Sequence, residues 1–553
     1  MTKRIALTVS LCMLPSFAFA GATDFVSSGS DKEVTAALNA FRASINGGAN
    51  ANVAGSFLSG RREINWDGVP DTLASPNAFP FDFFNQPNPG RARGAEFFTA
   101  GSGFLVSADN DNPTGAAVNF GDIDPSYGAE FRAFSQQRLF AANGSTITNV
   151  RFYIPGQSQV RATTTAFGVI FCDVDIADET RLEYYDQLGR LIHTIQVPAS
   201  SAGQGGFSFA GAVFAGGERI WRVAIKCGTR ALGGPEDVGA GVDIVVMDDF
   251  AYAEPVPATN PEMFGAAGSD AEVTAELDRF RESLGTLNAN TPGSVGSGRR
   301  EINWDAAPDG VSSPNALPPD FFNADTPGRA RGTVFSTPGS GFEVSADDDN
   351  PTATPPDFAH IDPSYAALFR AFTPQRLFTS IGSNITEVDL FVPGSSDAAD
   401  TNGFGAVFTD VDLPTSARID WLDRNGGLLA SVHAPVGSAP EESFSFLGAK
   451  FEPPYRVASI RITAGSSALG AGVVESVVEG LDLVVMDDFI YGEPVLLSSC
   501  PVDLDHSGVV NSSDFFTFLT LFFAQSPAAD FNADGVIDSN DFYNYLSSFF
   551  AGC

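Results

Sequence analysis

Positive charge is scarce in this chain. Its 553 residues include 31 lysines and arginines against 67 acids, a formal net charge of −36 at pH 7. Four of the cations are lysines, namely Lys3, Lys32, Lys226 and Lys450. A chain this acidic repels phosphate backbones, so nucleic acid is excluded as a partner and anionic membranes are disfavoured. The acidity itself has two interpretations: a surface kept soluble by charge, or a surface that holds cations.

Long apolar runs are missing as well. No segment reaches the ~18 consecutive apolar residues of a membrane-spanning helix, so we expect no transmembrane segment. Lys3 and Arg4 precede a short apolar stretch, 5–14, and Ala18–Ala20 has the A-x-A form of a cleavage site. We therefore expect residues 1–20 to be a secretory signal peptide and the mature protein to be secreted, either extracellular or at the cell surface.

Histidine, the commonest general acid–base residue, occurs four times, and no histidine has a histidine counterpart in the internal repeat described below. The sequence contains no Ser-His-Asp set, no catalytic cysteine motif, no H-E-x-x-H and no phosphate-binding glycine loop. Enzyme activity therefore stays open but disfavoured, and it would have to rest on carboxylates.

Cysteine is also rare, with five in the chain, and Cys12 lies in the expected signal peptide. In an oxidising compartment Cys500 and Cys553 would close the C-terminal segment with a disulfide. Cys172 and Cys227 form the other expected disulfide. Both occur in the first repeat and both are absent from the second, as a bonded pair would be.

The chain does contain a long internal repeat. Gly60–Asp67 (GRREINWD) recurs as Gly298–Asp305, and Val245–Phe250 (VVMDDF) recurs as Val484–Phe489. A period this long indicates two whole domains in tandem, because solenoid repeats are far shorter. We expect a first repeat domain over 21–256, a proline-rich linker over 257–262, a second repeat domain over 263–495 and a C-terminal module over 500–553.

Each repeat begins with a predicted helix and continues as predicted strands. Ser30 with Glu33, and Ser269 with Glu272, form capping boxes ahead of apolar stripes at helical spacing. Short β-branched and aromatic runs then alternate with Gly, Pro, Asn and Asp clusters, which is typical of antiparallel sandwiches. We expect a mainly β fold of two tandem jelly-roll-like β-sandwich domains, each with an N-terminal helix. Strands are predicted over 167–171, 181–185 and 242–246 and at their counterparts.

Two pairs of acids in each repeat are candidates for metal or catalytic chemistry. Three interpretations stay open: turn and strand-end chemistry, a Ca²⁺ site built by carboxylates from several strands, and a glycosidase pair, which needs two carboxyls ~5–9.5 Å apart in a cleft. The candidates are Asp173, Asp175, Asp248 and Asp249 in the first repeat and Asp410, Asp412, Asp487 and Asp488 in the second.

The repeated GRREINWD segment contains residue types that recognise ligands. An arginine and a tryptophan can anchor a sugar or a partner. A tryptophan in a Trp-poor chain is also often a core residue whose N–H is satisfied inside, and an arginine can lock a turn through an ion pair. Both the ligand-binding and the structural interpretation stay open for Arg62, Trp66, Arg300 and Trp304.

The C-terminal segment contains two twelve-residue loops, Asp503–Asp514 and Asp530–Asp541. Each has oxygen-bearing side chains at positions 1, 3, 5, 9 and 12 and glycine at position 6, the spacing that wraps a chain around Ca²⁺. The first loop has three carboxylates and the second has four, so we expect the second to bind more tightly. The predicted ligands, with a backbone carbonyl from position 7, are Asp503, Asp505, Ser507, Val509, Asn511 and Asp514 in the first loop and Asp530, Asn532, Asp534, Val536, Asp538 and Asp541 in the second.

Two such loops, each followed by one predicted helix and each with Asp at position 12, resemble a dockerin-type module. The resemblance implies Ca²⁺ as the cofactor and attachment to a cohesin-like or other surface protein. The apolar stretches Phe515–Phe523 and Phe542–Phe550 would form the helices, either packed on each other or docked on another surface. The repeats themselves resemble uncharacterised secreted β-sandwich proteins.

These features favour a secreted, calcium-binding, non-catalytic surface or matrix protein. Its tandem sandwiches would bind polysaccharide or another extracellular ligand, because a second weak site on one chain raises the apparent affinity. One alternative is a polysaccharide-degrading glycoside hydrolase that carries a dockerin module. A second alternative is a purely structural envelope protein.

Overall fold

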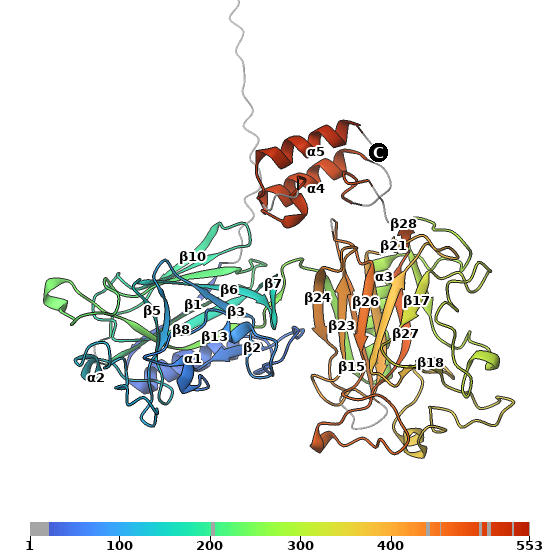
Figure 1. Ribbon diagram of the computed structural model, residues 1–553, viewed down its shortest axis with the longest axis horizontal. Helices are drawn as coiled ribbons and strands as arrows, with labels where there is room; N and C mark the ends of the chain where they lie inside the picture. The colour runs from blue at the N-terminus through green and yellow to red at the C-terminus, as the bar shows by residue number, and fades with distance from the viewer. Residues whose placement is uncertain are drawn as a thin grey trace, which may run out of the picture.

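The computed structural model describes residues 21–200, 205–437, 443–453, 455–496, 500–505, 510–532 and 536–551. Two β-sandwiches lie side by side, and a small helical module lies outside both of them (Figure 1). The mainly β fold, with two sandwiches in tandem and a helix at the start of each, is confirmed. The expected signal peptide lies outside the described residues. Within the described part of the chain, no helix has the length and apolar character needed to cross a bilayer.

The first sandwich consists of two antiparallel sheets whose inner faces supply the core. Strand residues alternate between the faces: in β6, Val150, Phe152 and Ile154 point inward and are fully buried. The first sheet has the order β1 (Thr23–Gly29), β11 (Phe207–Val213), β8 (Ala166–Cys172), β13 (Val246–Ala253), β5 (Phe140–Asn143), β4 (Gly103–Val106), with β2 (Arg61–Ile64) paired to β13. The second has the order β10 (Leu191–Gln196), β9 (Arg181–Tyr185), β12 (Arg222–Lys226), β6 (Ile147–Ile154), β7 (Gln157–Thr163), β14 (Val256–Pro257), with β3 (Ala95–Phe98) paired to β6.

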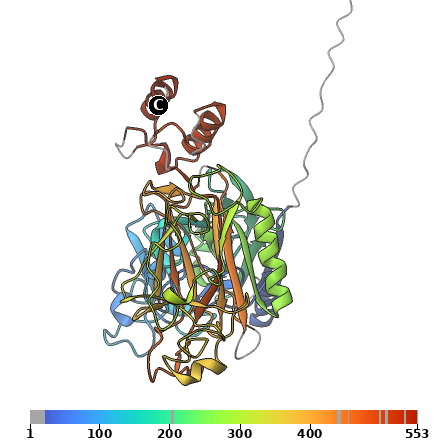
Figure 2. The same ribbon diagram turned by 90° about the vertical axis from the view of Figure 1, so that its right-hand side faces the viewer.

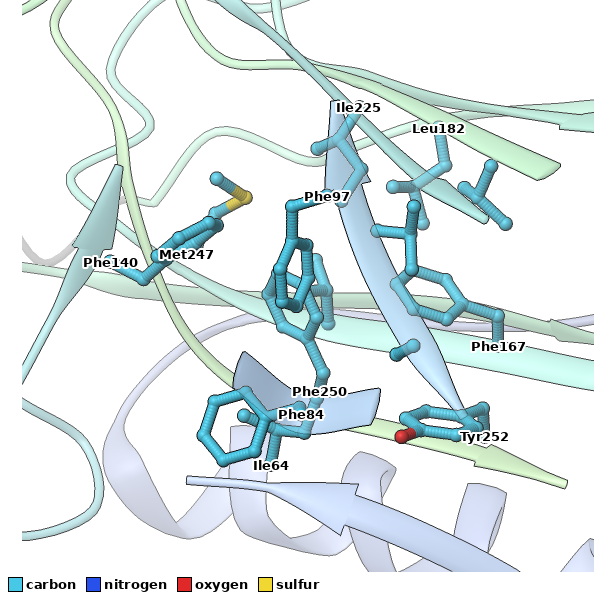
Figure 3. Packing of buried hydrophobic residues seen from close by; sticks show 14 of the residues in the cluster. Ile64, Phe84, Phe97, Phe140, Phe167, Leu182, Ile225, Met247, Phe250 and Tyr252 are labelled. Carbon is cyan, nitrogen blue, oxygen red and sulfur yellow. The ribbon is translucent and has the colours of Figure 1, made fainter. Parts of the chain in front are cut away.

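Aromatic rings dominate the core between these sheets. The Trp66 ring stacks on Phe140 with centroids 3.8 Å apart and meets Phe250 edge-on at 5.3 Å. Phe140, Phe167 and Phe250 gather between the strands with other rings and aliphatic side chains (Figure 3). The Trp66 indole Nε1 donates to the Asp248 carbonyl at 2.9 Å, so its polar atom is satisfied inside the core.

One helix covers the outer face of the first sheet in each sandwich. The α1 helix (Asp31–Ser44) begins after Ser30, whose backbone N–H donates to the Glu33 carboxylate at 2.9 Å while its hydroxyl accepts the Glu33 N–H at 3.4 Å. The capping box is therefore confirmed, as is its counterpart at α3 (Asp270–Leu284). The apolar stripes of both helices are buried against the sheet beneath them. Figure 2 shows α3, in green, lying along its sheet.

The second sandwich repeats this plan. Its helix-covered sheet has the order β15 (Glu262–Gly268), β25 (Phe444–Lys450), β22 (Gly403–Thr409), β27 (Val485–Gly492), β19 (Phe378–Ile381), β18 (Gly341–Val344), with β16 (Arg299–Ile302) on β27. The facing sheet has the order β17 (Thr333–Ser336), β20 (Ile385–Leu390), β26 (Ser459–Thr463), β23 (Arg418–Leu422), β24 (Leu428–His433), and β21 (Ala399–Asp400) pairs with β28 (Val495–Leu496). Short helical segments are α2 (Tyr127–Glu130), η1 (Asp71–Leu73), η2 (Phe83–Asn85), η3 (Val238–Ala240), η4 (Asp309–Val311), η5 (Pro363–Ala367) and η6 (Val477–Glu479).

Two of the three predicted strand positions are correct and one is displaced. The run 167–171 lies within β8, and 181–185 is β9. The run 242–246 is wrong, because β13 begins at Val246 and residues 243–245 belong to no strand. The fully buried Asp243 carboxylate instead accepts the backbone N–H groups of Asp175 at 3.4 Å and Ile176 at 3.1 Å, which holds this segment against the end of β8.

The two sandwiches contact each other through a short backbone pairing. The Ser56 N–H donates to the Ser431 carbonyl at 2.8 Å, and the His433 N–H donates to the Ser56 carbonyl at 3.0 Å. The His433 ring stacks on Phe57 at 4.8 Å and its Nε2 donates to the Ala54 carbonyl at 2.9 Å. A buried, neutral imidazole therefore lies at the centre of the contact between the sandwiches.

The C-terminal module contains α4 (Ser512–Phe523), the turn η7 (Pro527–Ala529) and α5 (Ser539–Ala551). The buried rings of Phe518 and Tyr545 stack between the two helices at 3.9 Å. Mutual packing therefore accounts for part of the aromatic content. Four large side chains stay 64–82% exposed: Phe516, Phe523, Tyr543 and Phe550.

The predicted disulfide between Cys172 and Cys227 is wrong, because both thiols are free and buried. Cys172 packs beneath α1 on the outer side of the first sheet, whereas Cys227 packs in the core between the sheets. Burial raises the pKa of both thiols, which makes them unreactive. Cys500 is disulfide-bonded. Its expected partner, Cys553, lies outside the described residues, so that pairing stays a prediction.

Candidate metal centres

Two of the predicted acids, Asp173 and Asp175, lie next to a third that was not predicted, Glu236. One carboxylate oxygen from each of the three lies within 4.8 Å of the other two. Asp173 and Asp175 follow β8, and Glu236 belongs to the segment that leads into β13, the neighbouring strand. Carboxylates that converge from neighbouring strand ends suit a hard divalent cation such as Ca²⁺.

Asp173 has the most unusual environment of the three. It is fully buried, and its φ of 70° is in the left-handed region that residues other than glycine rarely adopt. Its Oδ1 accepts the Gly205 N–H at 2.9 Å, but its Oδ2 has no hydrogen-bond partner among the described residues. A buried carboxylate oxygen without a donor is costly in free energy, and a bound cation would remove that cost.

Glu236 and Asp243 complete an entirely acidic group. Burial, and next the neighbouring acids, raise the pKa of Asp173 to about 7 and the pKa of Glu236 to about 8. Within the described part of the chain, no lysine or arginine forms an ion pair with Asp173, Asp175, Glu236 or Asp243. The site therefore lacks a compensating positive charge.

The second sandwich has counterparts of these acids with matching backbone features. Asp410 is fully buried and has the same φ of 70°. Glu475 accepts the Leu483 N–H at 3.0 Å, as Glu236 accepts the N–H of Ile244 at 2.8 Å. The buried Asp482 accepts the backbone N–H of Asp412 at 3.0 Å, as Asp243 does for Asp175. The candidate residues of this second centre are Asp410, Asp412, Glu475 and Asp482.

The repeat contained a signal for the missed acids. Glu236 and Glu475 lie at the same distance before the VVMDDF segment, and so do Asp243 and Asp482. The residues around them differ between the copies, which obscures the correspondence when each segment is read by itself.

Asp248 and Asp249 form a separate pair inside β13, where the pairing register with β8 shifts. Asp248 accepts the Phe134 N–H at 2.6 Å, and Asp249 accepts the Ser135 hydroxyl at 2.7 Å. Their exposures are 0% and 8%, so these acids fasten a loop to the strand and do not line an open cleft. Burial raises the pKa of Asp248. Asp487 and Asp488 occupy the same place in β27.

Arg62 and Trp66 are structural, and the ligand-binding interpretation is wrong for them. The Arg62 side chain is fully buried, with Nη2 at 2.7 Å and Nε at 2.8–3.0 Å from the Glu254 carboxylate oxygens. Arg62 also donates to the Gly55 carbonyl at 3.0 Å. Trp66 fills the core as described above. Arg300, Trp304 and Glu493 have the same roles in the second sandwich.

The first C-terminal loop also gathers its acids. One carboxylate oxygen each from Asp503, Asp505 and Asp514 lies within 4.8 Å of the other two. Asp514 is fully buried, and its two oxygens accept the backbone N–H groups of Asp505 at 3.1 Å and Asn511 at 2.8 Å. Burial, and next the neighbouring acids, raise the pKa of Asp514. The predicted ligands Ser507 and Val509 lie outside the described residues.

The second loop is organised around Asp541. Its Oδ2 accepts the Asp538 N–H at 2.9 Å, and its Oδ1 accepts the N–H groups of Phe531 at 2.7 Å and Asn532 at 3.1 Å. These backbone hydrogen bonds lower the pKa of Asp541. Each position-12 aspartate thus holds its own loop closed at the start of the following helix. Of the other predicted ligands, Asp530 and Val536 are described, and Asp534 lies outside the described residues.

Comparisons with known proteins assign no family. No family model matches the chain, and no curated protein matches it. Similar solved structures include tandem CBM32 domains of Clostridium perfringens ZmpB, 9% identical with a TM-score of 0.14 over 70% of this chain and 92% of that one. They also include tandem CBM51 modules of Sp3GH98 from Streptococcus pneumoniae, 10% identical with a TM-score of 0.17 over 72% and 99%. A tandem CBM22 pair from Paenibacillus barcinonensis Xyn10C is 9% identical with a TM-score of 0.17 over 65% and 88%. These TM-scores are too low to support an inference, so the sites themselves must support the function.

Proposed function

We propose that this chain is an extracellular, non-catalytic protein that binds Ca²⁺ in both sandwiches and in its C-terminal module. The observation that carries the proposal is the group of Asp173, Asp175 and Glu236, whose oxygens converge within 4.8 Å without a basic partner among the described residues. Ca²⁺ takes six to eight oxygen ligands at short range, and the three converging carboxylates, with Asp243 beside them, would supply part of that set. The cation would neutralise repulsion that the fold otherwise contains.

The C-terminal module would bind Ca²⁺ through its two dockerin-type loops and serve as the attachment point. The convergence of Asp503, Asp505 and Asp514 supports the first loop, and the loop-closing bonds of Asp541 support the second. The exposed aromatic side chains of the two helices are suited to contact with a cohesin-like or other surface protein.

Polysaccharide is the ligand we propose for the sandwiches. Two similar sandwiches on one chain increase the apparent affinity for a polymer that offers many equivalent positions. Hydrolysis is the less supported alternative, because Asp248 and Asp249 are buried and bonded to a loop, and Asp173 is buried as well. Neither pair has the open cleft that a glycosidase mechanism requires.

Calcium titration of the EDTA-stripped chain tests this proposal. Asp173→Asn and Asp410→Asn should each remove one bound ion, and Asp514→Asn should weaken the first loop of the module. Asp178→Asn is a matched control, since Asp178 lies in the same segment as Asp175 but is exposed. If the only Ca²⁺ uptake is that of the C-terminal module, and Asp173→Asn and Asp410→Asn leave it unchanged, then the sandwiches do not bind Ca²⁺. Reducing-sugar release from a polysaccharide panel would restore the hydrolase alternative.

A further inference from the structure

The outward face of the second sheet in the first sandwich presents arginines interleaved with aromatic rings. Core residues such as Val150 and Val223 point inward, so Arg151 and Arg222, their neighbours in β6 and β12, point outward. Arg151 lies directly opposite Arg222 in the strand pairing. We call this surface the arginine–aromatic face, and its residues are Phe98, Arg151, Arg161, Tyr185, Trp221 and Arg222.

Ring stacking holds the three guanidinium groups of this face in place. The Arg151 guanidinium lies 4.2 Å from the Phe98 ring centroid and 5.4 Å from that of Trp221. Arg161 lies 4.7 Å from Trp221 on the same face. A cation over a ring gains about 0.5–2 kcal/mol, and stacking leaves the N–H groups directed outward in the plane of the guanidinium, although the Nε of Arg151 is itself buried.

Like Arg91 and Arg329, these arginines stack on rings and form no ion pair with a carboxylate among the described residues. The chain has 67 acids, and other arginines, such as Arg62, lie within 3 Å of one. Among the described residues, Arg151, Arg161 and Arg222 form no ion pair. Arg222 donates to the side-chain amide oxygen Oδ1 of Asn149 at 2.6 Å and stacks on Tyr185 at 3.7 Å. Three arginines therefore lie together on this face of an otherwise acidic protein.

Two acids lie close to this face, and each has hydrogen-bond partners of its own. Glu183, one position from the Arg222–Tyr185 row, accepts from Arg181 at 2.7 Å and from the Tyr185 hydroxyl at 2.7 Å. Glu96, opposite Arg151 in β3, accepts from the Asn85 amide at 2.8 Å and is 3% exposed. Neither acid is within ion-pair distance of Arg151 or Arg222, although Glu96 interacts electrostatically with Arg151 and Glu183 with Arg222.

The second sandwich lacks this face although its strands pair in the same way. Asp389 lies opposite Ser459, where the first sandwich has Arg151 opposite Arg222. The neighbouring Arg461 is neutralised by Glu387 at 2.6 Å. The sandwich fold therefore does not require the arginine–aromatic face, and its presence in one copy indicates recognition.

We propose that the arginine–aromatic face binds an anionic polysaccharide, one that carries carboxylate or sulfate groups along its backbone. This deepens, and rests on, the proposed polysaccharide function. A guanidinium pairs with a carboxylate or sulfate through two parallel hydrogen bonds, and an aromatic ring packs on the apolar face of a sugar. The chain as a whole has a formal net charge of −36 and repels polyanions, so binding depends on these short-range contacts.

Dextran, carboxymethyl-dextran and dextran sulfate share one sugar backbone and differ in their charged groups. Comparing them therefore distinguishes recognition of charge from recognition of the backbone. Affinity electrophoresis of the full, Ca²⁺-saturated chain measures binding to each, with neutral xylan and cellulose alongside. We expect the chain to bind at least one charged dextran about tenfold or more tightly than dextran, an advantage that falls with salt. Arg151→Ala with Arg161→Ala should remove most of this advantage, and Trp221→Ala should weaken it. The matched control is Arg461→Ala on the same face of the second sandwich, which should bind as the unchanged chain does.

Each outcome decides between the proposals. Equal binding of dextran and its charged derivatives, or an equal loss in Arg461→Ala, overturns the arginine–aromatic face while leaving polysaccharide binding intact. Binding to none of the neutral or charged polymers overturns the proposed polysaccharide function as well. Arg161 is exposed, so Arg161→Glu alone tests the face without risk to folding and should abolish preference for the charged polymers. Thermal melts of each variant confirm that the sandwiches are folded.

Discussion

Replacing Asp173 with asparagine should stabilise the first sandwich in EDTA and abolish its stabilisation by Ca²⁺. Asp173 has two acidic partners, with oxygens within 4.8 Å. At an effective dielectric constant of about 20, two like charges at that separation repel each other by about 3 kcal/mol. Asparagine keeps an acceptor for the Gly205 N–H, now at 2.9 Å, and removes the charge. At about pH 9, above the raised pKa values near 7 and 8 of Asp173 and Glu236, the gain should be about 3 kcal/mol.

Saturating Ca²⁺ should make the unchanged protein melt at a higher temperature than Asp173→Asn. A ligand at one thousand times its Kd stabilises the folded state by about 4.1 kcal/mol, which exceeds the gain of about 3 kcal/mol from the substitution, and only the unchanged protein has the full ligand set. For a domain of this size a change of about 1 kcal/mol moves the melting temperature by roughly 2–4 °C. Differential scanning calorimetry therefore resolves the difference both in EDTA and in saturating Ca²⁺. Asp173→Asn should melt higher in EDTA and gain nothing from the site in saturating Ca²⁺.

Two results would refute this reasoning. A lower melting temperature of Asp173→Asn in EDTA would mean that the carboxylate stabilises the fold through its hydrogen bond more than it destabilises it by repulsion. If Ca²⁺ raised the melting temperature of that variant as much as it raises that of the unchanged protein, the cation would bind elsewhere. Asp410→Asn repeats the test on the second sandwich, and Asp178→Asn controls for the loss of one surface charge.

Three further predictions follow from other groups. Arg62→Met should destabilise the first sandwich by about 3–5 kcal/mol in denaturant unfolding, because it leaves Glu254 buried and unpaired. Adding Glu254→Gln should recover part of this loss. No recovery would mean that the buried charge is not the cause. In the C-terminal module, calorimetry should show that Asp541→Ala removes the tighter Ca²⁺ site and Asp514→Ala the weaker one, since the second loop has one more carboxylate; equal affinities would contradict this. Burial lowers the pKa of His433 from 6.5 to about 4. The contribution of the neutral imidazole to the free energy of unfolding is therefore complete above pH 6.5 and falls by about 3 kcal/mol as the pH drops to 4. Thermal melts of His433→Gln with the same pH dependence as the unchanged chain would contradict this.

The broad fold could be predicted because its signals are local. The Ser30–Glu33 capping box and the apolar stripe behind it determine a helix within a few residues of chain. The alternation of inward and outward side chains likewise determines the strand β9 from a few residues of chain. The displaced strand at 242–246 shows the limit of such signals. Its apolar pattern is that of a strand, but Asp243 bonds to the backbone after β8, a contact between segments distant in sequence.

The candidate sites divide along the same line. The C-terminal loops follow a local spacing, so their acids could be named in advance. The sandwich centre depends on which strands pair: Asp173 and Asp175 could be named, but Glu236 joins them only because β13 lies beside β8. The paired cysteines illustrate the opposite error. Their joint presence in one repeat suggested a bond, yet Cys172 and Cys227 face opposite sides of a sheet.

The duplication helps to separate what the fold requires from what one copy recognises. The buried Arg–Glu pair, the stacked tryptophan and the buried left-handed aspartate of the acidic centre all occur in both sandwiches, at matching places. A bound cation at that centre would therefore belong to the architecture, holding the segment before the last long strand against its neighbour. The arginine–aromatic face occurs once, on a sheet whose counterpart has Asp389 and a neutralised arginine. Calcium would then keep both sandwiches folded, while the polymer would be selected by the first alone. A chain that loses Arg151 and Arg161 should accordingly keep its full Ca²⁺ response and lose its preference for charged polysaccharide.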